Sequence, residues 1–329
     1  MNTSIKRKVA ALLALALGTT ALCGCNQEVP VTLDTPSPWH DGSNSYERLV
    51  YDVTIYNGTG DDRETLANGS LAFTLEEFSG GATAFGYSTL DMDFTVTYTD
   101  KAAESERGLT DTVTSRVEFL TDSLHASKSS KTVAVAKREG VADLSYKIEA
   151  DYMNEHSATV TMTGGEEDVI SNIAIPSGTY YDNEMMFYLA RATKLAAGGS
   201  CAFKMVNLFD SYNTGKFTDY NMVASVDEDI ASVEIGDWVK DYGVEPVTNE
   251  ETLAVSFPIP CYYTSVYIND TRHGPPHYVY YSEKPFVSDG KTHNKIPVFM
   301  HYSEYYGNLL SRYTEYKLTS CSFVKTTQD

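Results

Sequence analysis

The chain has 329 residues, and 42% of them are hydrophobic, which excludes a disordered or collagen-like protein and suffices for one large β domain or two smaller ones. Its 45 acidic and 25 basic residues give a formal net charge of −20. This balance argues against nucleic-acid binding and against electrostatic binding to anionic lipid, because both need clustered Lys and Arg.

Residues 1–24 have the pattern of an export signal. Three basic residues, Lys6–Lys8, precede the apolar run Val9–Leu17, which is too short to span a bilayer. The following Leu22-Cys23-Gly24-Cys25 resembles the lipobox of bacterial lipoproteins. The resemblance implies cleavage before Cys25, lipidation of its thiol and anchoring in the outer leaflet of the cytoplasmic membrane or in the outer membrane. The alternative is a plain secretory signal with incidental cysteines.

Residues 25–46 are expected to be a flexible tether, since Pro30, Pro36 and Pro38 lie among small polar residues. Residues 47–329 are expected to form a single β-rich domain. Their dominant pattern is period-two alternation, as in the run from Asp91 to Thr99, which is typical of strands with one buried face. Turn pairs such as Asn57-Gly58 punctuate these runs, so the pattern predicts an antiparallel meander.

One segment, residues 183–197, departs from the strand pattern and predicts the principal α-helix. Asp182 can cap its start, and Met185, Leu189, Ala192 and Leu195 recur at helical spacing. A lone amphipathic helix can bury such a stripe only on the sheet. We therefore expect the helix to pack against the inner face of the sheet and to form one wall of any pocket.

Arg191 in this helix has two interpretations. It can be an exposed or snorkelling side chain that pairs with a nearby carboxylate. It can instead be a buried or rim residue that fixes the helix to the sheet or meets an anionic head group.

Tyrosine is concentrated near the C-terminus, where 11 of the 24 Tyr residues lie between positions 262 and 316. Adjacent pairs on a strand point to opposite faces, so one Tyr of each pair is exposed or lines a cavity. Such side chains suit stacking against sugars, peptides or amphipathic lipids. The candidate ligand-binding residues are Met185, Leu189, Arg191, Tyr263, Tyr280 and Tyr302.

Metal and nucleophile signals are weak. His273 and His277 flank a Gly-Pro-Pro turn and, with His301, are weak candidates for a metal site; the alternative is a hairpin turn with exposed His. Among the mature cysteines, Cys201 and two others in strand-like runs can form at most one disulfide, or can be buried free thiols. The chain carries no hydrolase, kinase or dinucleotide motif, so we expect no catalytic residue and no cofactor.

Short motifs resemble an exported bacterial family, domain of unknown function 3108. The resemblance rests on Tyr51–Tyr56, Phe187–Arg191 with Gly198-Gly199, Tyr281-Ser282, Pro285, Ile296-Pro297-Val298 and Gly307. It implies a strongly curved antiparallel sheet, a half-barrel or clam-like meander, with the helix packed inside. That shape is similar to the lipoprotein-carrier proteins of the bacterial envelope, which hold acyl chains. The family has no settled activity.

Three functions remain open. The first is a non-enzymatic, lipid-anchored envelope protein that binds an amphipathic or hydrophobic ligand in its curved sheet. The alternative is a surface interaction module that binds protein or glycan through exposed Tyr, and a metal- or carboxylate-dependent hydrolase is a third. Tyr side chains around a cavity would favour the first function, and a flat outer patch would favour the second. The expected partners are the membrane, through Cys25, and a lipid, peptide or glycan ligand.

Overall fold

The computed structural model describes residues 46–57, 63–78, 86–104, 106–137, 145–163, 167–193, 196–268, 277–306 and 309–325. All of them belong to one compact unit, Val31–Asp329. The predicted export signal, the predicted lipidation site Cys25 and residues 25–45 of the predicted tether lie outside the described residues.

Fifteen strands of the described chain form one sheet. They are β1 (Tyr46–Asn57), β2 (Glu64–Phe78), β3 (Tyr87–Tyr98), β4 (Thr110–Leu120), β5 (Ala126–Ala134), β6 (Tyr146–Asp151), β7 (Ser157–Met162), β8 (Val169–Ala174), β9 (Tyr181–Asp182), β10 (Ser200–Val206), β11 (Asp219–Glu234), β14 (Pro258–Ile268), β15 (His277–Ser282), β18 (Pro297–Tyr306) and β19 (Leu309–Ser322). Two hairpins stand apart from it: β12 (Val247–Thr248) with β13 (Val255–Ser256), and β16 (Phe286–Ser288) with β17 (Lys291–His293).

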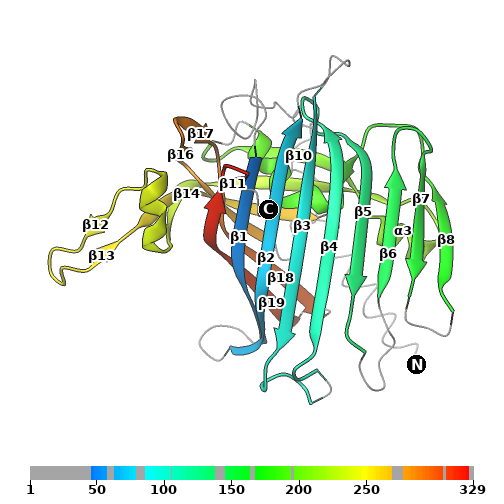
Figure 1. Cartoon of the computed structure of the whole chain (residues 1–329), viewed down its shortest axis with the longest axis horizontal. Coiled ribbons are helices and arrows are strands. Elements are labelled where there is room, and N and C mark those ends of the chain that lie inside the picture. The colour runs from blue at the N-terminus through cyan, green and yellow to red at the C-terminus, as the bar shows by residue number, and fades with distance from the viewer. Residues whose placement is uncertain are drawn as a thin grey trace, which may run out of the picture. The chain divides into compact units, whose positions relative to one another are not determined.

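The first and last strands of the sheet lie side by side near its middle (Figure 1). The order runs β8-β7-β6-β5-β4-β3-β2-β1 and continues β19-β18-β15-β14-β11-β10-β9. Neighbours pair antiparallel except the short β9, which runs parallel to β10. Two meanders are therefore joined by the pairing of β1 with β19, which closes the chain on itself and ties its two ends together.

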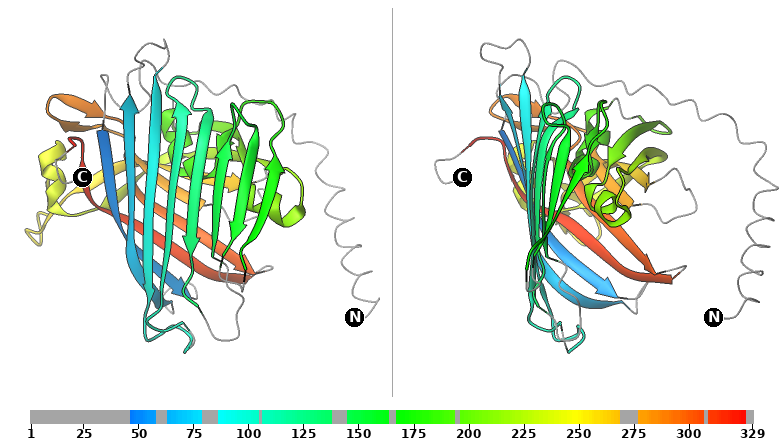
Figure 2. Two further views of the ribbon diagram at one scale, coloured as in Figure 1. Left: turned by 45° about the vertical axis from the view of Figure 1, so that its right-hand side comes forward. Right: turned by 90° about the vertical axis from the view of Figure 1, so that its right-hand side faces the viewer.

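The sheet is strongly curved. Strands β1 to β8 form one wall, and the strands from β19 to β10 turn away from that wall, so that the helices at residues 183–192 and 208–214 lie on the concave side (Figure 2). Besides the pairing of β1 with β19, a backbone hydrogen bond joins the two halves of the sheet directly. The Ala126 N–H at the start of β5 donates to the Tyr180 carbonyl just before β9, at 2.9 Å. The two halves of the sheet thus face each other. The predicted fold, a mainly β protein with a curved antiparallel sheet, is confirmed.

The predicted helix is present but is shorter than 183–197. It consists of η2 (Asn183–Met185), α2 (Met186–Leu189) and η3 (Ala190–Ala192), which follow one another without a break; we call these residues the helical segment. Asp182 caps its start as predicted, since its carboxylate accepts from the Glu184 N–H at 2.9 Å. It ends because Thr193 takes an extended conformation and its hydroxyl donates to the Ala190 carbonyl at 2.7 Å. Leu195 lies outside the described residues.

Two further helices were not predicted. Helix α3 (Leu208–Thr214) starts at Asn207, whose side chain accepts from two backbone N–H groups, and stops at Gly215, which has a φ of 65°. It packs against β7 and β8. The second, η4 (Asp237–Tyr242), lies between β11 and β12. None of the helices in the described part of the chain is long and apolar enough to cross a membrane.

The core lies on the concave face of the sheet. In β1 the alternate residues Leu49, Tyr51, Val53 and Ile55 are all buried, as the period-two pattern predicts. A register shift beside Tyr51, where β19 carries an extra residue, leaves this alternation intact. The buried face of β1 therefore lies on the side of the sheet that holds the helical segment.

Candidate functional site

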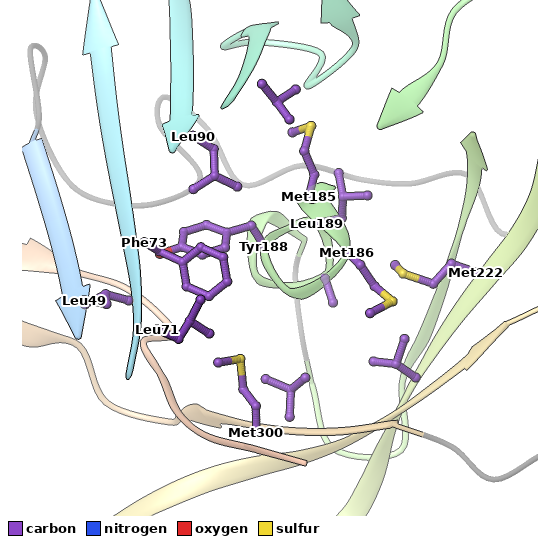
Figure 3. Packing of buried hydrophobic residues seen from close by; sticks show 14 of the residues in the cluster. Leu49, Leu71, Phe73, Leu90, Met185, Met186, Tyr188, Leu189, Met222 and Met300 are labelled. Atoms are coloured by element: carbon purple, nitrogen blue, oxygen red, sulfur yellow. The ribbon is translucent and has the colours of Figure 1, made fainter. Parts of the chain in front are cut away.

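The helical segment fills the concave side of the sheet. The predicted stripe residues Met185, Leu189 and Ala192 are fully buried. Figure 3 shows Met185, Met186, Tyr188 and Leu189 leaving the segment in different directions and meeting side chains from several strands. The segment is therefore enclosed on more than one side, and its apolar side chains pack against other core residues of the protein.

An ion pair fixes this segment to the first strand. Both Nη atoms of Arg191 donate to the two carboxylate oxygens of Glu47, at 2.5 and 2.6 Å, and its Nε donates to the Asn294 carbonyl at 2.8 Å. The Tyr188 hydroxyl donates to the same carboxylate at 3.3 Å. Arg191 and Glu47 are both buried. The structure thus agrees with the second interpretation of Arg191, a buried residue that fixes the helix to the sheet.

Electrostatics favour the charged form of Arg191 in this pair. Burial alone would lower the pKa of Arg191, but the adjacent Glu47 carboxylate outweighs that effect and raises the pKa above its ordinary value. The pKa of the Tyr188 hydroxyl is raised well above its ordinary value by burial and by the negative charge of Glu47. The site therefore holds a charged guanidinium and a neutral phenol, both of which donate to Glu47, while the guanidinium also donates to the Asn294 carbonyl.

A second group of side chains lies on the opposite, convex face. Seven aromatic residues cross β14, β15, β18, β19 and β1, and we call them the aromatic surface. They are Tyr56, Tyr263, Tyr278, Tyr280, Phe299, His301 and Tyr313. The face is assigned by Tyr281, the neighbour of Tyr280, which is fully buried and donates from its hydroxyl to the Phe187 carbonyl of the helical segment at 2.6 Å.

The rings of the aromatic surface stack on one another across the strands. Tyr263 lies 5.1 Å from Tyr278 and 4.9 Å from Tyr280, measured between ring centroids. Tyr280 meets Phe299 edge to face at 5.5 Å, and Tyr278 lies 5.7 Å from His301. These five side chains are half-buried, so each presents part of its ring to solvent.

Arg63 covers the other end of this surface. His301 lies 5.0 Å from Tyr313, which stacks on Tyr56 at the same distance. The Arg63 guanidinium lies 4.5 Å from the centre of the Tyr56 ring, and it pairs with Glu315 at 3.0 Å. The result is one continuous ridge of aromatic rings that ends in a cation.

Of the candidate ligand-binding residues, Tyr263 and Tyr280 come together on the aromatic surface. Tyr302 lies apart, on the concave face, where its ring stacks on His277 at 4.0 Å. Met185, Leu189 and Arg191 lie in the core. The six residues predicted from the sequence therefore fall into separate environments and do not form one site.

The weak metal candidates do not converge. Tyr278 pairs with His301 across β15 and β18, so His277, the neighbour of Tyr278, points to the opposite face from His301. His273 lies outside the described residues. Within the ranges that the structure describes, no group of three or more His, Cys, Asp or Glu is placed to hold a metal ion.

His277 is a buried neutral histidine. Burial, and secondarily the nearby His301, lowers its pKa to about 4. The unfolded chain would bind a proton at His277 below about pH 6.5, whereas the folded protein would not, so stability falls as the pH falls from about 7 to 4. The largest contribution is about 3 kcal/mol, from 1.36 kcal/mol per pKa unit. We expect His277→Gln to remove this part of the pH dependence of the urea midpoint; a slope unchanged by the substitution would contradict it.

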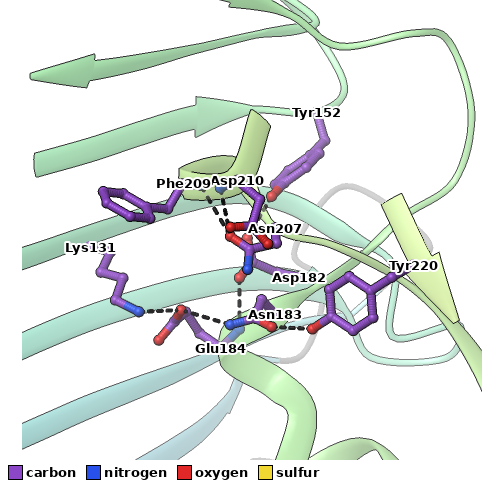
Figure 4. A network of polar contacts seen from close by, with 9 residues as sticks. All are labelled: Lys131, Tyr152, Asp182, Asn183, Glu184, Asn207, Phe209, Asp210 and Tyr220. Carbon is purple, nitrogen blue, oxygen red and sulfur yellow. Dashed lines mark hydrogen bonds and ion pairs between the residues drawn. The ribbon is translucent and has the colours of Figure 1, made fainter. Parts of the chain in front are cut away.

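A small polar cavity of about 130 Å³ lies where β5 and β6 face the start of the helical segment. Its walls come from β5, β6, the start of the helical segment and the start of α3 (Figure 4). Lys131 of β5 reaches across it and donates to Glu184 at 2.7 Å. Tyr146 stacks on Phe209 at 4.4 Å and forms one side. The predicted apolar stripe does not line this cavity, which is bordered by the polar residues at the start of the helical segment.

The charges in this cavity are compensated by the protein itself. Burial alone would lower the pKa of Lys131, but Glu184 outweighs it and raises the pKa. Burial raises the pKa of the Asp182 carboxyl, which accepts from the Tyr152 hydroxyl at 2.5 Å. The Tyr220 hydroxyl donates to Asn183. The network thus joins β5 to the helical segment, and sequence reasoning missed it.

The three described cysteines are buried free thiols. Burial raises the pKa of Cys201 to about 11, and it also raises the pKa values of Cys261 and Cys321. Because a nucleophilic cysteine needs a lowered pKa, these residues act as small apolar side chains.

No family model matches the chain, and no curated protein matches it. Among solved structures, it is similar to the beta-barrel-like protein of domain of unknown function DUF1849 from Brucella abortus. The two chains are 12% identical with a TM-score of 0.45, and the match covers 86% of this chain and 99% of the other.

Proposed function

We propose that this protein is an exported, lipid-anchored, non-enzymatic binding protein that holds a partner polypeptide on its aromatic surface. The observation that carries the proposal is the continuous ridge of rings on the convex face, half-buried except for the buried Tyr313, with Arg63 over its end. Tyr and Arg are the residue types that dominate the binding energy of protein interfaces. Tyr also supplies a large contact area with little loss of side-chain entropy.

The export signal and the Cys25 motif support the location. A basic segment, a short apolar run and Leu22-Cys23-Gly24-Cys25 follow one another in the order that lipoprotein export requires. Two or three acyl chains on Cys25 would hold the protein at a membrane surface. The resemblance to domain of unknown function 3108 is consistent with export. Export and lipidation are predictions from the sequence.

The packing of the concave face favours the convex face as the binding site. The first function considered, a ligand held within the curved sheet, needs apolar space beside the helical segment. Met185, Leu189 and Ala192 are fully buried there, and Arg191 is held by Glu47. A ligand could enter only if this segment moved out and left the Glu47 charge unpaired, which is energetically costly.

The ring geometry favours a polypeptide over a glycan. A sugar binds an aromatic side chain by stacking on its open face, but the rings of Tyr263, Tyr278 and Tyr280 are stacked on one another. The Tyr56 ring is likewise covered by Tyr313 and by Arg63. What remains for a partner is a row of ring edges and hydroxyl groups, which suits side chains and backbone groups of another protein.

Cross-linking mass spectrometry on cells that produce the protein tests this proposal. We expect the double variant Tyr263→Ser/Tyr280→Ser to lose its cross-linked partner, with binding weakened about 30-fold or more, since one hot-spot residue contributes about 2 kcal/mol or more. The matched control is Thr95→Ala/Thr97→Ala. These two exposed side chains lie on β3, on the same convex face of the sheet as Tyr263 and Tyr280. Both variants should stay folded, because the changed side chains are exposed or only half-buried, although the lost stacking of Tyr263 on Tyr280 should lower the melting temperature of the Tyr variant.

Two results would contradict the proposal. One is a partner that binds the Tyr263→Ser/Tyr280→Ser variant as tightly as it binds the wild type. The other is saturable binding of a fluorescent fatty acid by the purified protein, which would return the function to the interior of the sheet.

A further inference from the structure

The two ends of the large sheet differ in how they are protected. β9 has two residues, runs directly into the helical segment and is preceded by the Tyr180 carbonyl that accepts from Ala126. β8 at the other end has six residues and is the last strand of the sheet (Figure 1). An unpaired strand edge is a template for pairing with another chain unless something blocks it.

Three of the usual protections of an edge strand are missing from β8. Its residues Val169–Ala174 include no proline and no charged side chain, and its register with β7 runs without a bulge. Two apolar side chains on it are largely exposed, Val169 at 55% and Ile170 at 63%. β8 is thus a regular, neutral and apolar edge on a protein that otherwise carries many charges.

The backbone groups of β8 that no other described residue pairs with can be assigned. The Ile175 N–H donates to the His156 carbonyl at 2.8 Å, in register with the ladder between β7 and β8. In an antiparallel ladder the backbone groups alternate between the two sides of a strand. Residues 173, 171 and 169 therefore bond to β7, and Ile170, Asn172 and Ala174 direct their N–H and C=O groups away from it.

We propose that β8 of one copy pairs antiparallel with β8 of a second copy, about a two-fold axis at Asn172. In this register Asn172 lies opposite Asn172 and Ile170 lies opposite Ala174 of the other copy. All three pairs of outward backbone groups on each strand are then satisfied. Side chains of the two copies also keep to the same faces, with Val169 beside Ile175 of the second copy.

Charge favours this antiparallel self-pairing over a parallel one. The acidic residues Glu167 and Asp168 directly precede β8, and Pro176 follows it. In the proposed register Asp168 lies opposite Pro176 of the second copy, and the two Asp168 side chains are about 27 Å apart, at 3.4 Å per residue. That distance exceeds the screening length in physiological salt. A parallel pair would place the two acidic ends against each other.

The association is expected to be weak and to strengthen with salt. One six-residue strand pair is small beside a standard protein interface. Each copy carries a formal net charge of −20, so the copies repel at long range and added salt weakens that repulsion. An interface built on ion pairs would instead weaken with salt.

Analytical ultracentrifugation of the purified full chain tests the proposal. We expect a monomer–dimer equilibrium in the wild type, its loss in Asn172→Pro and its retention in Asn172→Ala. Proline removes the outward N–H of residue 172 and leaves the ladder to β7 intact, and the alanine control loses the same side chain but keeps that N–H. A wild type that stays monomeric at all concentrations and salts, or an Asn172→Pro variant that dimerises as the wild type does, would overturn it.

A cysteine pair tests the register. Residues opposite each other in a hydrogen-bonded antiparallel pair have Cα atoms about 5.5 Å apart, within the range of a disulfide. Asn172→Cys should therefore form a covalent dimer under mild oxidation. Ile170→Cys should not, because the two copies of residue 170 are four positions apart. Equal cross-linking of both variants would contradict the proposed axis.

Discussion

Arg191→Met is expected to lower the free energy of unfolding by about 3–5 kcal/mol, because it leaves the Glu47 carboxylate buried without its partner. Globular proteins are stable by about 5–15 kcal/mol, so this loss removes a large share of the total. Urea denaturation followed by circular dichroism measures it. Arg191→Lys should also destabilise, since one ammonium group cannot reach both Glu47 oxygens and the Asn294 carbonyl as the guanidinium does.

The matched control is an exposed ion pair between an arginine and an aspartate on the convex face. Arg116 pairs with Asp91 at 2.8 Å, but both side chains are substantially exposed to water. We expect Arg116→Met to cost less than about 1 kcal/mol, as is typical of surface ion pairs. Equal effects at Arg191 and Arg116 would show that the Glu47 pair is not buried.

Leu189→Asp is expected to destabilise the protein by several kcal/mol, enough to prevent folding at moderate temperature. Leu189 is fully buried at the centre of the helical segment, so the substitution places an unpaired carboxylate in the core (Figure 3). Thermal unfolding followed by circular dichroism measures the effect. Leu189→Met, which keeps the volume, should cost less than about 1.5 kcal/mol. An unchanged melting temperature in Leu189→Asp would mean that the segment is a surface appendage.

Period-two alternation was enough to predict the strands and their buried faces. In β1 the side chains of Leu49, Tyr51 and Val53 are buried as the pattern requires, because one side of a curved sheet must face a core. The helical stripe Met185, Leu189 and Ala192 was predicted for the same reason. The length of the helix was not, because Thr193 ends it through a local side-chain bond to Ala190 that spacing does not reveal.

The sequence offered Arg191 as a residue that fixes the helix to the sheet, but it did not predict the partners in the polar contacts, because these lie far apart in the sequence. Glu47 and Arg191 are 144 positions apart, and Lys131 and Glu184 are 53 apart. One signal was present in both cases. Glu47 has the same alternation phase as Leu49 in β1, and Lys131 has the same phase as Val133 in β5. A charged residue on the buried face of a strand has to find a partner of opposite charge.

Adjacent Tyr pairs predicted that one ring of each pair would face away from the core. For Tyr280 and Tyr281 the structure shows this arrangement. Sequence could not reveal that Tyr263, Tyr278 and Tyr280 stack into one surface, since that depends on the register between β14 and β15. The same dependence on register separates His277 from His301.

We infer that the helical segment is a fixed part of the core, so that a partner must bind on the convex face. Hydrogen–deuterium exchange of the helical segment tests this inference most directly. We predict that amides in 186–192 exchange as slowly as those of β1 and β19, because Arg191 can leave Glu47 only when the sheet unfolds. Exchange of these amides within seconds, while β1 and β19 stay protected, would contradict this. The segment would then be a mobile cover over an interior binding site.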